Sequence, residues 1–182
     1  MSNFPAAGVY TVDAAHSRLG FVARHLVVSK VRGNFTQFEG TVTIGDTPET
    51  SSVSATAQAA SITTNNDMRD GHLQSADFLD ASNHPQITFV STSVSQKAGN
   101  EYALTGDLTI RGVTKSVTFD LEFTGAGESM QPGVSVAGFE ARTEIDRRDF
   151  GVNFEGVLEN GTAVVSHKIV LELEVELASQ AA

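Results

Sequence analysis

The chain contains no cysteine, and this absence excludes several kinds of protein at once. Without thiols there is no disulfide, no thiolate metal site and no cysteine nucleophile. A chain of 182 residues can still bury a sizeable hydrophobic core without such cross-links. We therefore expect a single domain over residues 1–182, stabilised by packing and hydrogen bonds.

Cations are scarce as well, since 12 Lys and Arg residues stand against 22 Asp and Glu residues and the net charge is −10. This balance argues against nucleic acid and anionic membrane surfaces as the main partners. No apolar run is long enough to span a bilayer, and the N-terminal segment lacks the basic start and apolar stretch of a signal peptide. The expected location is therefore cytoplasmic.

Catalytic and metal-binding motifs are also missing. The sequence has no G-x-S-x-G elbow for a nucleophilic serine. His16 and His25 are nine residues apart, so on one unbroken strand they would point to opposite faces and could not share an ion. His72 and His84 lie in separate segments with no ligand spacing between them. We expect no catalytic residue, no metal site and no cofactor.

What the chain does contain is alternation of apolar and polar residues. The pattern is clearest over 169–177, where Ile, Leu and Val share one parity and Glu takes the other. Such a segment suits an antiparallel strand with one face in the core and one in water. Turns rich in Gly and Asn separate the runs. The sequence predicts an all-β fold with strands at 8–12, 18–28, 35–44, 53–62, 87–94, 104–110, 117–123, 134–145, 162–165 and 169–177.

One stretch, residues 65–79, breaks the alternation with helix-like composition. Asn66 is a candidate N-cap, and acidic residues follow in the first turn. A short amphipathic helix of this kind can close one end of a barrel, and we expect its apolar closure to come from Met68, Leu73 and Phe78. Two accounts of its polar residues remain open. The helix is a capped plug with Arg69 paired to a carboxylate, or Arg69 and His72 form the polar gate of a pocket.

A second ambiguity concerns the inward face of the 53–62 run, which presents only small or modest side chains. Small inward residues leave volume for a ligand unless bulky neighbours fill it. Ordinary large-against-small packing is the alternative. If a cavity exists, parity and position predict that its wall includes Phe21, Ala57, Phe89, Leu108, Phe119 and Phe139.

The charged cluster at 147–151 also has two interpretations. It is a strand-end ion-pair corner with Phe150 turned inward, or it recognises a headgroup or partner.

Several segments together resemble a known family. They are YTVDAAHSRLGF (10–21), HLVVSKVRGNF (25–35), SITTN (61–65), RDGHLQSADFL (69–79), HPQITFVS (84–91), GDLTIRGVTK (106–115) and RRDFG (147–151). In this order and spacing they resemble the YceI-like family of polyisoprenoid-binding proteins, over about nine-tenths of the chain.

The resemblance implies a lipocalin-like, extended antiparallel β-barrel of eight strands with a helical insertion. It also implies that the apolar interior holds a long isoprenoid, such as a quinone or polyprenyl compound, or a related lipid. Relatives of this kind act as carriers or reservoirs. Many form dimers, and many are exported with a leader peptide; the N-terminal segment of this sequence does not show such a pattern. We expect a lipid ligand, a homodimer and transient contact with a membrane.

The headgroup of such a lipid would need polar partners. The candidates are Arg69, His72 and His25, with Arg24, Lys30 and Arg32 around the last. Because the chain is acidic overall, it offers no long-range attraction to an anion, which favours a neutral or weakly polar headgroup. Two other functions stay open: a small enzyme that uses His25 or His72 as acid or base on a lipid-like substrate, and a stress-related module whose filled barrel binds only protein.

Overall fold

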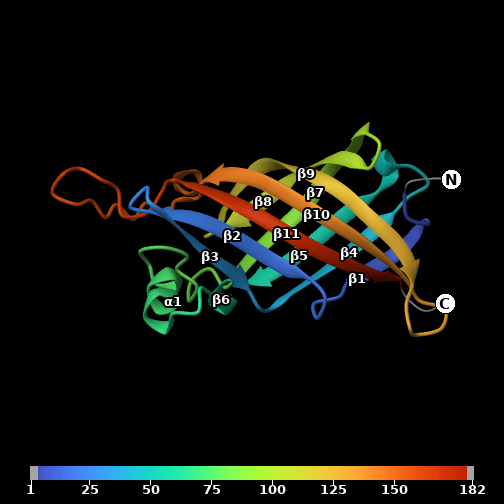
Figure 1. Cartoon of the computed structure of the whole chain (residues 1–182), viewed down its shortest axis with the longest axis horizontal. Coiled ribbons are helices and arrows are strands. Elements are labelled where there is room, and N and C mark those ends of the chain that lie inside the picture. Colours follow the sequence, from blue (N-terminus) through green and yellow to red (C-terminus); the bar gives the residue numbers. More distant parts are fainter. Residues whose placement is uncertain (1–3, 180–182) are drawn as a thin grey trace.

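The computed structural model describes residues 4–179 of the 182-residue chain. Long antiparallel strands wrap into an elongated barrel, with both termini at one end and the single α-helix at the other (Figure 1). The strands are β1 (Gly8–Val12), β2 (Arg18–His25), β3 (Ser29–Phe35), β4 (Phe38–Ile44), β5 (Ser52–Gln58), β6 (Ile62–Thr63), β7 (Gln86–Ala98), β8 (Glu101–Ile110), β9 (Val113–Glu128), β10 (Ser135–Asp146) and β11 (Lys168–Ser179). The helices are α1 (Asp67–Gln74) and the 3-10 turns η1 (Pro48–Thr50), η2 (Ala59–Ser61) and η3 (Arg147–Phe150).

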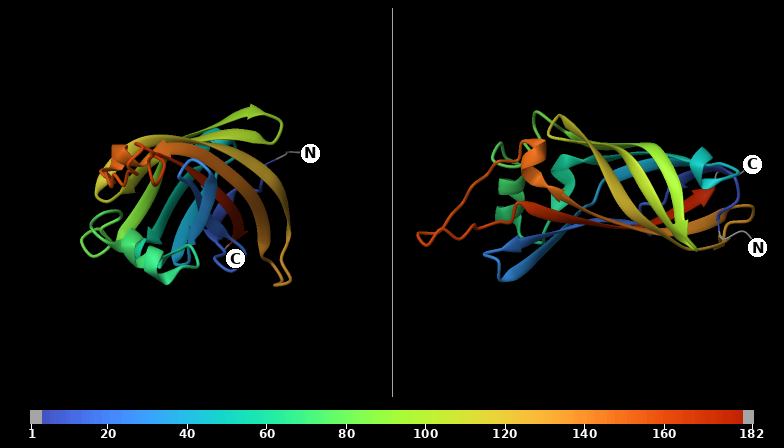
Figure 2. Two further views of the ribbon diagram at one scale, coloured as in Figure 1. Left: turned by 60° about the vertical axis from the view of Figure 1, so that its left-hand side comes forward. Right: turned by 90° about the horizontal axis from the view of Figure 1, so that it is seen from above.

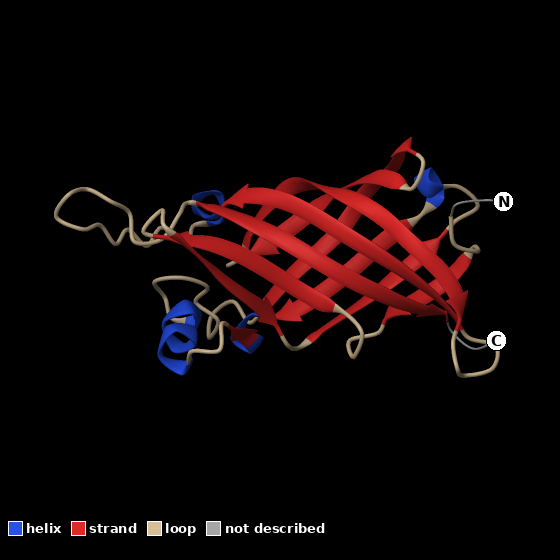
Figure 3. Cartoon of the chain, in the orientation of Figure 1, coloured by secondary structure: helices blue, strands red, loops and turns tan. Residues whose placement is uncertain are grey.

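The sheet closes on itself because β1 pairs with both β4 and β11. The ring runs β1-β4-β5-β7-β8-β9-β10-β11 and returns to β1. Strands β2, β3 and β6 continue this ring toward the helical end, with β2 on β11, β3 on β2 and β6 on β3. The predicted eight-stranded antiparallel barrel with a helical insertion is therefore confirmed. Figure 3 shows how little of the wall is anything other than strand.

Four strand predictions were wrong in detail. The turn η2 interrupts the run 53–62, and the run 35–44 spans the break between β3 and β4. The run 18–28 is not one strand, because a tight turn after β2 sends the chain back as β3. Leu26 and Val27 adopt left-handed φ angles of 52° and 65°, which is uncommon for any residue other than glycine and rare for a β-branched one such as Val27. The Leu26 amide donates to the Val164 carbonyl oxygen at 3.1 Å, so a tertiary contact supports the turn. Residues 162–165 form isolated bridges to Val157 and His25 and no regular strand.

The end that carries the termini is packed with side chains. Tyr102 and Ala137 are each 1% exposed, and Leu177 is 2% exposed. Tyr10 belongs to the same end, where its hydroxyl donates to the Ala6 carbonyl oxygen. The strands themselves provide this closure, because inward-facing residues of β1, β4, β10 and β11 form a core cluster there.

Further along the barrel, two phenylalanine rings lie against glycines of neighbouring strands. A Cβ atom added to Gly33 would lie 2.4 Å from Cζ of Phe21, and one added to Gly106 would lie 2.5 Å from Cζ of Phe89. The absence of a side chain at each glycine thus lets the ring approach the backbone of the wall closely. Rings held in this way take up less of the barrel interior.

The opposite end is closed by segments that are not barrel strands. Helix α1, the turn η3 and the connection 151–167 gather there, as both views in Figure 2 show. Asn66 caps α1 as expected, since its side-chain oxygen accepts a hydrogen bond from the Arg69 amide at 3.0 Å. Phe154 from the connection packs on Phe78 after the helix, with ring centroids 4.8 Å apart. This end therefore depends on contacts between short segments.

Candidate ligand cavity

A cavity of about 310 Å³ lies inside the barrel. Apolar side chains from the barrel strands make up nearly all of its wall. Its volume falls in the range of small-molecule sites, which is roughly 300–1,000 Å³. Nine of the residues proposed from sequence lie on the wall: Phe21, Ala57, Leu73, Phe78, Phe89, Leu108, Phe119, Phe139 and Phe150. Their contact with a ligand stays a prediction.

The inward face of β5 shows both features that the sequence left open as alternatives, namely large-against-small packing and unfilled volume. Ala55 pairs with Phe89 of β7, and Ala57 pairs with Phe38 of β4, so small residues do stand beside large ones. The cavity nevertheless extends along both alanines. Large-against-small pairing shapes the wall without filling the interior.

The apolar closure by α1 is only partly as predicted. Leu73 and Phe78 reach the cavity, and Phe78 is 8% exposed. Met68 does not, because its side chain is 86% exposed and points to solvent. The face of α1 that carries Asp70 and Leu73 is turned toward the barrel, and these two residues are three positions apart. Met68 is two residues before Asp70, which places it on the opposite face of the helix.

Arg69 and Asp70 anchor the helix to the segment that precedes it. Nε of Arg69 donates to Oγ1 of Thr64 at 2.7 Å, and Nη2 donates to the Thr64 carbonyl oxygen at 3.2 Å. The buried Asp70 carboxylate accepts hydrogen bonds from the Thr64 amide at 2.8 Å and from the hydroxyls of Thr64 and Thr63. Burial raises the pKa of Asp70, but the bonds from Thr64 and Thr63 outweigh it and hold the pKa below its ordinary value.

Both accounts of Arg69 therefore need correction. Within residues 4–179, its guanidinium contacts Thr64 and no carboxylate, so it is not an ion-pair partner. Arg69 also does not contribute to the cavity wall. Sequence reasoning missed Asp70 as the central acceptor; the available signal was the pair Thr63 and Thr64, which precedes it by seven and six residues.

His72 lies outside the cavity, over the aromatic closure. Its Nε2 is 2.8 Å from Oδ2 of Asp77, and its ring stands edge-on to Phe78 and Phe154 at centroid distances of 5.0 and 5.1 Å. Sequence reasoning did not find Phe154, which follows a turn and belongs to no periodic run. His72 thus packs on the outside of the plug and does not gate the pocket.

The cations proposed around His25 do not reach the interior either. His25 ends β2, is exposed, and bridges Val165 through its backbone. Arg24, Lys30 and Arg32 are exposed on β2 and β3. The physical reason is the hairpin: the chain turns back after His25, and the cations on both of its strands remain in solvent.

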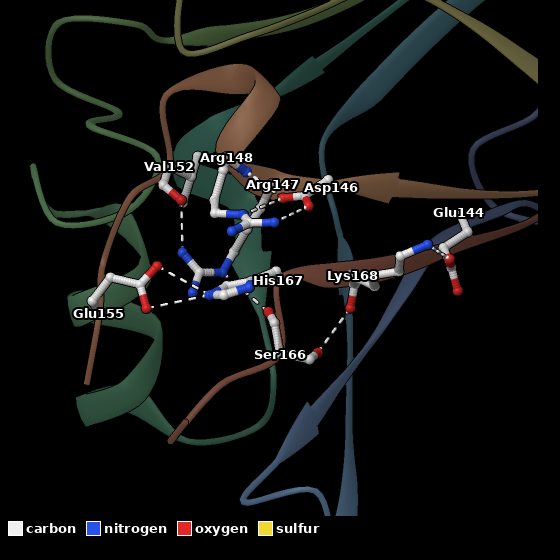
Figure 4. Close-up of polar contacts among 9 residues, drawn as sticks. All are labelled: Glu144, Asp146, Arg147, Arg148, Val152, Glu155, Ser166, His167 and Lys168. Carbon is white, nitrogen blue, oxygen red and sulfur yellow. Dashed lines mark hydrogen bonds and ion pairs between the residues drawn. The ribbon is translucent and has the colours of Figure 1, made fainter. Parts of the chain in front are cut away.

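The cluster at 147–151 contains two arginines with opposite environments (Figure 4). Arg148 is an outer ion-pair partner, since its Nη2 lies 2.6 Å from Oδ2 of Asp146. Hydrogen bonds from Arg148 hold the pKa of Asp146 well below its usual value. Arg147 is 5% exposed, and it lies on the cavity wall. The ion-pair interpretation is correct for Arg148 and wrong for Arg147.

Three potential metal ligands do come together, away from the cavity. The ligand atoms of Asp13, His16 and Glu176 lie within 4.8 Å of one another. Nδ1 of His16 is 2.9 Å from Asp13 and 3.8 Å from Glu176, and the hydrogen bond to Asp13 raises the pKa of His16. His25 is not part of this group. The contacts fit a hydrogen-bonded turn between β1 and β2.

A closed antiparallel barrel with an apolar interior and a helix at one mouth defines a lipocalin-like binding protein. Within residues 4–179, no helix has the length and apolar composition needed to cross a bilayer. Residues 10–177 match the YceI-like domain. The chain belongs to the YceI-like family.

Relatives and solved structures agree with this assignment. A UPF0312 protein of Staphylococcus aureus (strain MSSA476) is 40% identical over 171 residues, which is 93% of this chain and 96% of that protein. BcnA of Burkholderia cenocepacia superposes with a TM-score of 0.76 at 26% identity, covering 91% of this chain and 98% of BcnA. A polyisoprenoid binding domain from Saccharophagus degradans shares the fold, with a TM-score of 0.67 at 14% identity over 96% of this chain and 100% of that domain.

Proposed function

We propose that this protein binds a long-chain isoprenoid, such as a quinone or polyprenyl compound, or a related lipid inside the barrel, and stores or carries it without changing it chemically. The observation that carries the proposal is the cavity of about 310 Å³ with its nearly continuous apolar wall. The polyisoprenoid binding domain from Saccharophagus degradans, which has the same fold, supports the ligand class.

Burial of a lipid chain supplies enough free energy for such a role. About sixteen methylene groups at about 0.8 kcal/mol each give on the order of 13 kcal/mol before the costs of binding. Ordering of the chain and loss of free motion reduce this sum. One methylene more or less changes the energy only slightly, so the tail gives affinity and little selectivity.

The two alternative functions have less support. The acid–base candidates of the enzyme hypothesis, His25 and His72, are not among the described residues that line the cavity. A barrel that binds only protein would have no use for its interior, whereas this barrel retains a cavity. The lipid-binding role therefore accounts for more of the structure.

The experiment that tests the proposal is native mass spectrometry of the purified protein, followed by organic extraction and mass analysis of the released molecules. We expect one prenyl or fatty species per chain. Protein that is reproducibly empty, and that also refuses added quinones and polyprenyl phosphates, would contradict the proposal.

Substitution Ala57→Trp tests whether the ligand occupies the observed cavity. The indole would project from β5 into the cavity, so we expect a folded protein whose lipid affinity falls at least tenfold. Ser54→Trp is the matched control, since Ser54 is exposed on the same strand. Circular dichroism checks the fold, and calorimetry measures affinity. Unchanged binding in Ala57→Trp would remove this residue from the ligand's surroundings.

Transient membrane contact is the second part of the proposal. Val27 and Val28 are 69% and 86% exposed at the β2–β3 turn, while Val157 and Leu158 are 61% and 45% exposed in the connection 151–167. Both tips lie at the end of the barrel closed by α1 (Figure 1). Exposed apolar side chains at the mouth suit brief insertion among lipid chains, and the acidic chain favours neutral bilayers over anionic ones. A homodimer, as implied by the family resemblance, is proposed alongside.

A further inference from the structure

Arg147 is the one buried cation in residues 4–179, and it stands on the wall of the lipid cavity. It follows the last residue of β10, at the barrel end where α1 lies. The nearby side chains of Phe150 and Val152 line the same cavity and are 2% and 6% exposed. A guanidinium thus faces an otherwise apolar environment at the end of the barrel that α1 closes.

The hydrogen bonds of Arg147 leave much of the guanidinium uncommitted. Nε donates to the Ser166 carbonyl oxygen at 3.0 Å, and Nη1 donates to the Val152 carbonyl oxygen at 2.6 Å. A guanidinium has five N–H groups. Within the described part of the chain, Nη2 has no acceptor, and both acceptors of the other nitrogens are uncharged carbonyls.

The neighbouring carboxylates are engaged elsewhere (Figure 4). Asp146 accepts two hydrogen bonds from the side chain of Arg148, at 2.9 and 2.6 Å. Glu155 lies 3.0 Å from Nε2 of His167. Among the residues that the structure describes, none places a carboxylate oxygen within 4.0 Å of Arg147.

A buried charge without a counter-charge is costly, so buried cations in proteins are usually paired. The bonds to Ser166 and Val152 tie the connection 151–167 to η3 and give Arg147 a structural task. That task accounts for Nε and Nη1 but not for the free Nη2, nor for the choice of a permanently charged side chain on a cavity wall.

We propose that Arg147 binds the anionic head, a phosphate or carboxylate, of a lipid whose tail occupies the barrel. The inference rests on the proposed function. Glu155 and Asp146 attract the guanidinium from a distance, whereas the anion would supply a counter-charge in direct contact and accept charge-assisted hydrogen bonds from Nη2. Because the contact is local and lies on a largely apolar wall, it operates despite the net charge of −10. It replaces the expected preference for a neutral headgroup, which was based on overall charge.

The test compares ligands that share a tail and differ only in the head: farnesyl phosphate against farnesol, and palmitate against hexadecanol. Calorimetry gives each affinity for the delipidated protein. We expect at least one anion to bind tenfold or more tightly than its alcohol. In Arg147→Met, this ratio falls to about one, and the alcohol binds within about twofold of wild type. Arg148→Met is the matched control and keeps the wild-type ratio, because Arg148 contacts Asp146 outside the cavity.

The farnesyl pair reports on recognition of a phosphate head, and the palmitate–hexadecanol pair reports on recognition of a carboxylate head. If Arg147→Met does not fold, Arg147→Lys takes its place. Lysine keeps the positive charge but lacks the planar guanidinium with its parallel N–H groups. We therefore expect the ratio of anion affinity to alcohol affinity to fall severalfold yet remain above one. An unchanged ratio in a folded Arg147 variant overturns the inference. Equal wild-type affinity for anion and alcohol overturns it as well, but leaves lipid binding intact. If none of the four ligands binds, the proposed function fails together with it.

Discussion

The two ends of the barrel are closed in different ways. At the end with the termini, inward side chains of the strands pack against one another, and Tyr102 is 1% exposed. At the other end, α1, η3 and the connection 151–167 lie across the mouth, held by the Phe78–Phe154 contact and by the hydrogen bonds of Asp70 and Arg147. Exposed apolar residues such as Val28 and Leu158 lie at this second end.

This difference in closure determines which end of the barrel can open to admit a ligand. Opening the packed end would disrupt strand pairing and core together, at a cost close to that of unfolding. The helical end can open by local displacement of short segments, because local stability follows the density of packing and hydrogen bonding. We therefore expect a ligand to enter and leave beside α1.

The largest effect is expected at the packed end. Tyr102→Ala removes a fully buried aromatic ring, which costs about 3–5 kcal/mol of unfolding free energy. Urea denaturation measures this loss, with Tyr102→Phe as the control that retains the ring. A loss below about 1 kcal/mol would contradict the view that this end is a permanent plug.

An intermediate effect is expected for Asp70→Asn at the helical end. Loss of a buried carboxylate acceptor should cost about 2 kcal/mol at neutral pH. The pKa of Asp70 is lowered on folding, so its contribution is present above the unfolded pKa of about 3.9 and is lost as pH falls through the folded pKa. The difference between wild type and Asp70→Asn should therefore shrink on acidification below about pH 4 in denaturation experiments. A difference that stays constant down to pH 2 would show that the charge of Asp70 is irrelevant.

The effect of Phe154→Ala on stability is expected to be similar in size to that of Asp70→Asn, but its effect on ligand exchange is the most direct. The ring contacts to Phe78 and His72 are worth about 0.5–1.5 kcal/mol each beyond their burial. Weakening them should speed lipid release severalfold in stopped-flow transfer to vesicles. Phe123→Ala is the matched control, since Phe123 packs on Phe139 with centroids 5.3 Å apart near the packed end. Equal acceleration in both variants would remove the distinction between the ends.

The barrel could be predicted from the sequence because strand parity reports directly which side chains face inward. The segment 169–177 illustrates this, and β11 indeed pairs with β10 along its length. The turn at Leu26 and Val27 could not be predicted, because it contains no Gly, Asn or Pro and depends on a hydrogen bond to Val164, far along the chain.

The same parity predicted the apolar residues of the cavity wall, but it did not predict that Arg147 lies on this wall. Arg147 and Arg148 are adjacent and chemically identical, and the 3-10 turn at the end of β10 breaks the alternation that would otherwise assign their faces. The sequence likewise gave no register for α1 against the barrel, so Met68 could not be distinguished from Leu73. Sites made by irregular segments depend on packing that no local pattern encodes.

The breaks between consecutive short strands fall on one side of the barrel, whereas the ladders of the long strands are interrupted by bulges. Strands β7 to β11 are continuous over 10 to 16 residues, whereas β1 and β2, β3 and β4, and β5 and β6 meet at breaks around Asp13–Ser17, Thr36 and Ala59–Ser61. Hydroxyl groups bridge these breaks: the Ser17 hydroxyl accepts from the Glu176 amide, and the Ser61 hydroxyl accepts from the Thr36 amide. We therefore expect the side built of short strands to be the one that adjusts when chains of different thickness are bound, because the backbone hydrogen-bond ladder is interrupted at its breaks.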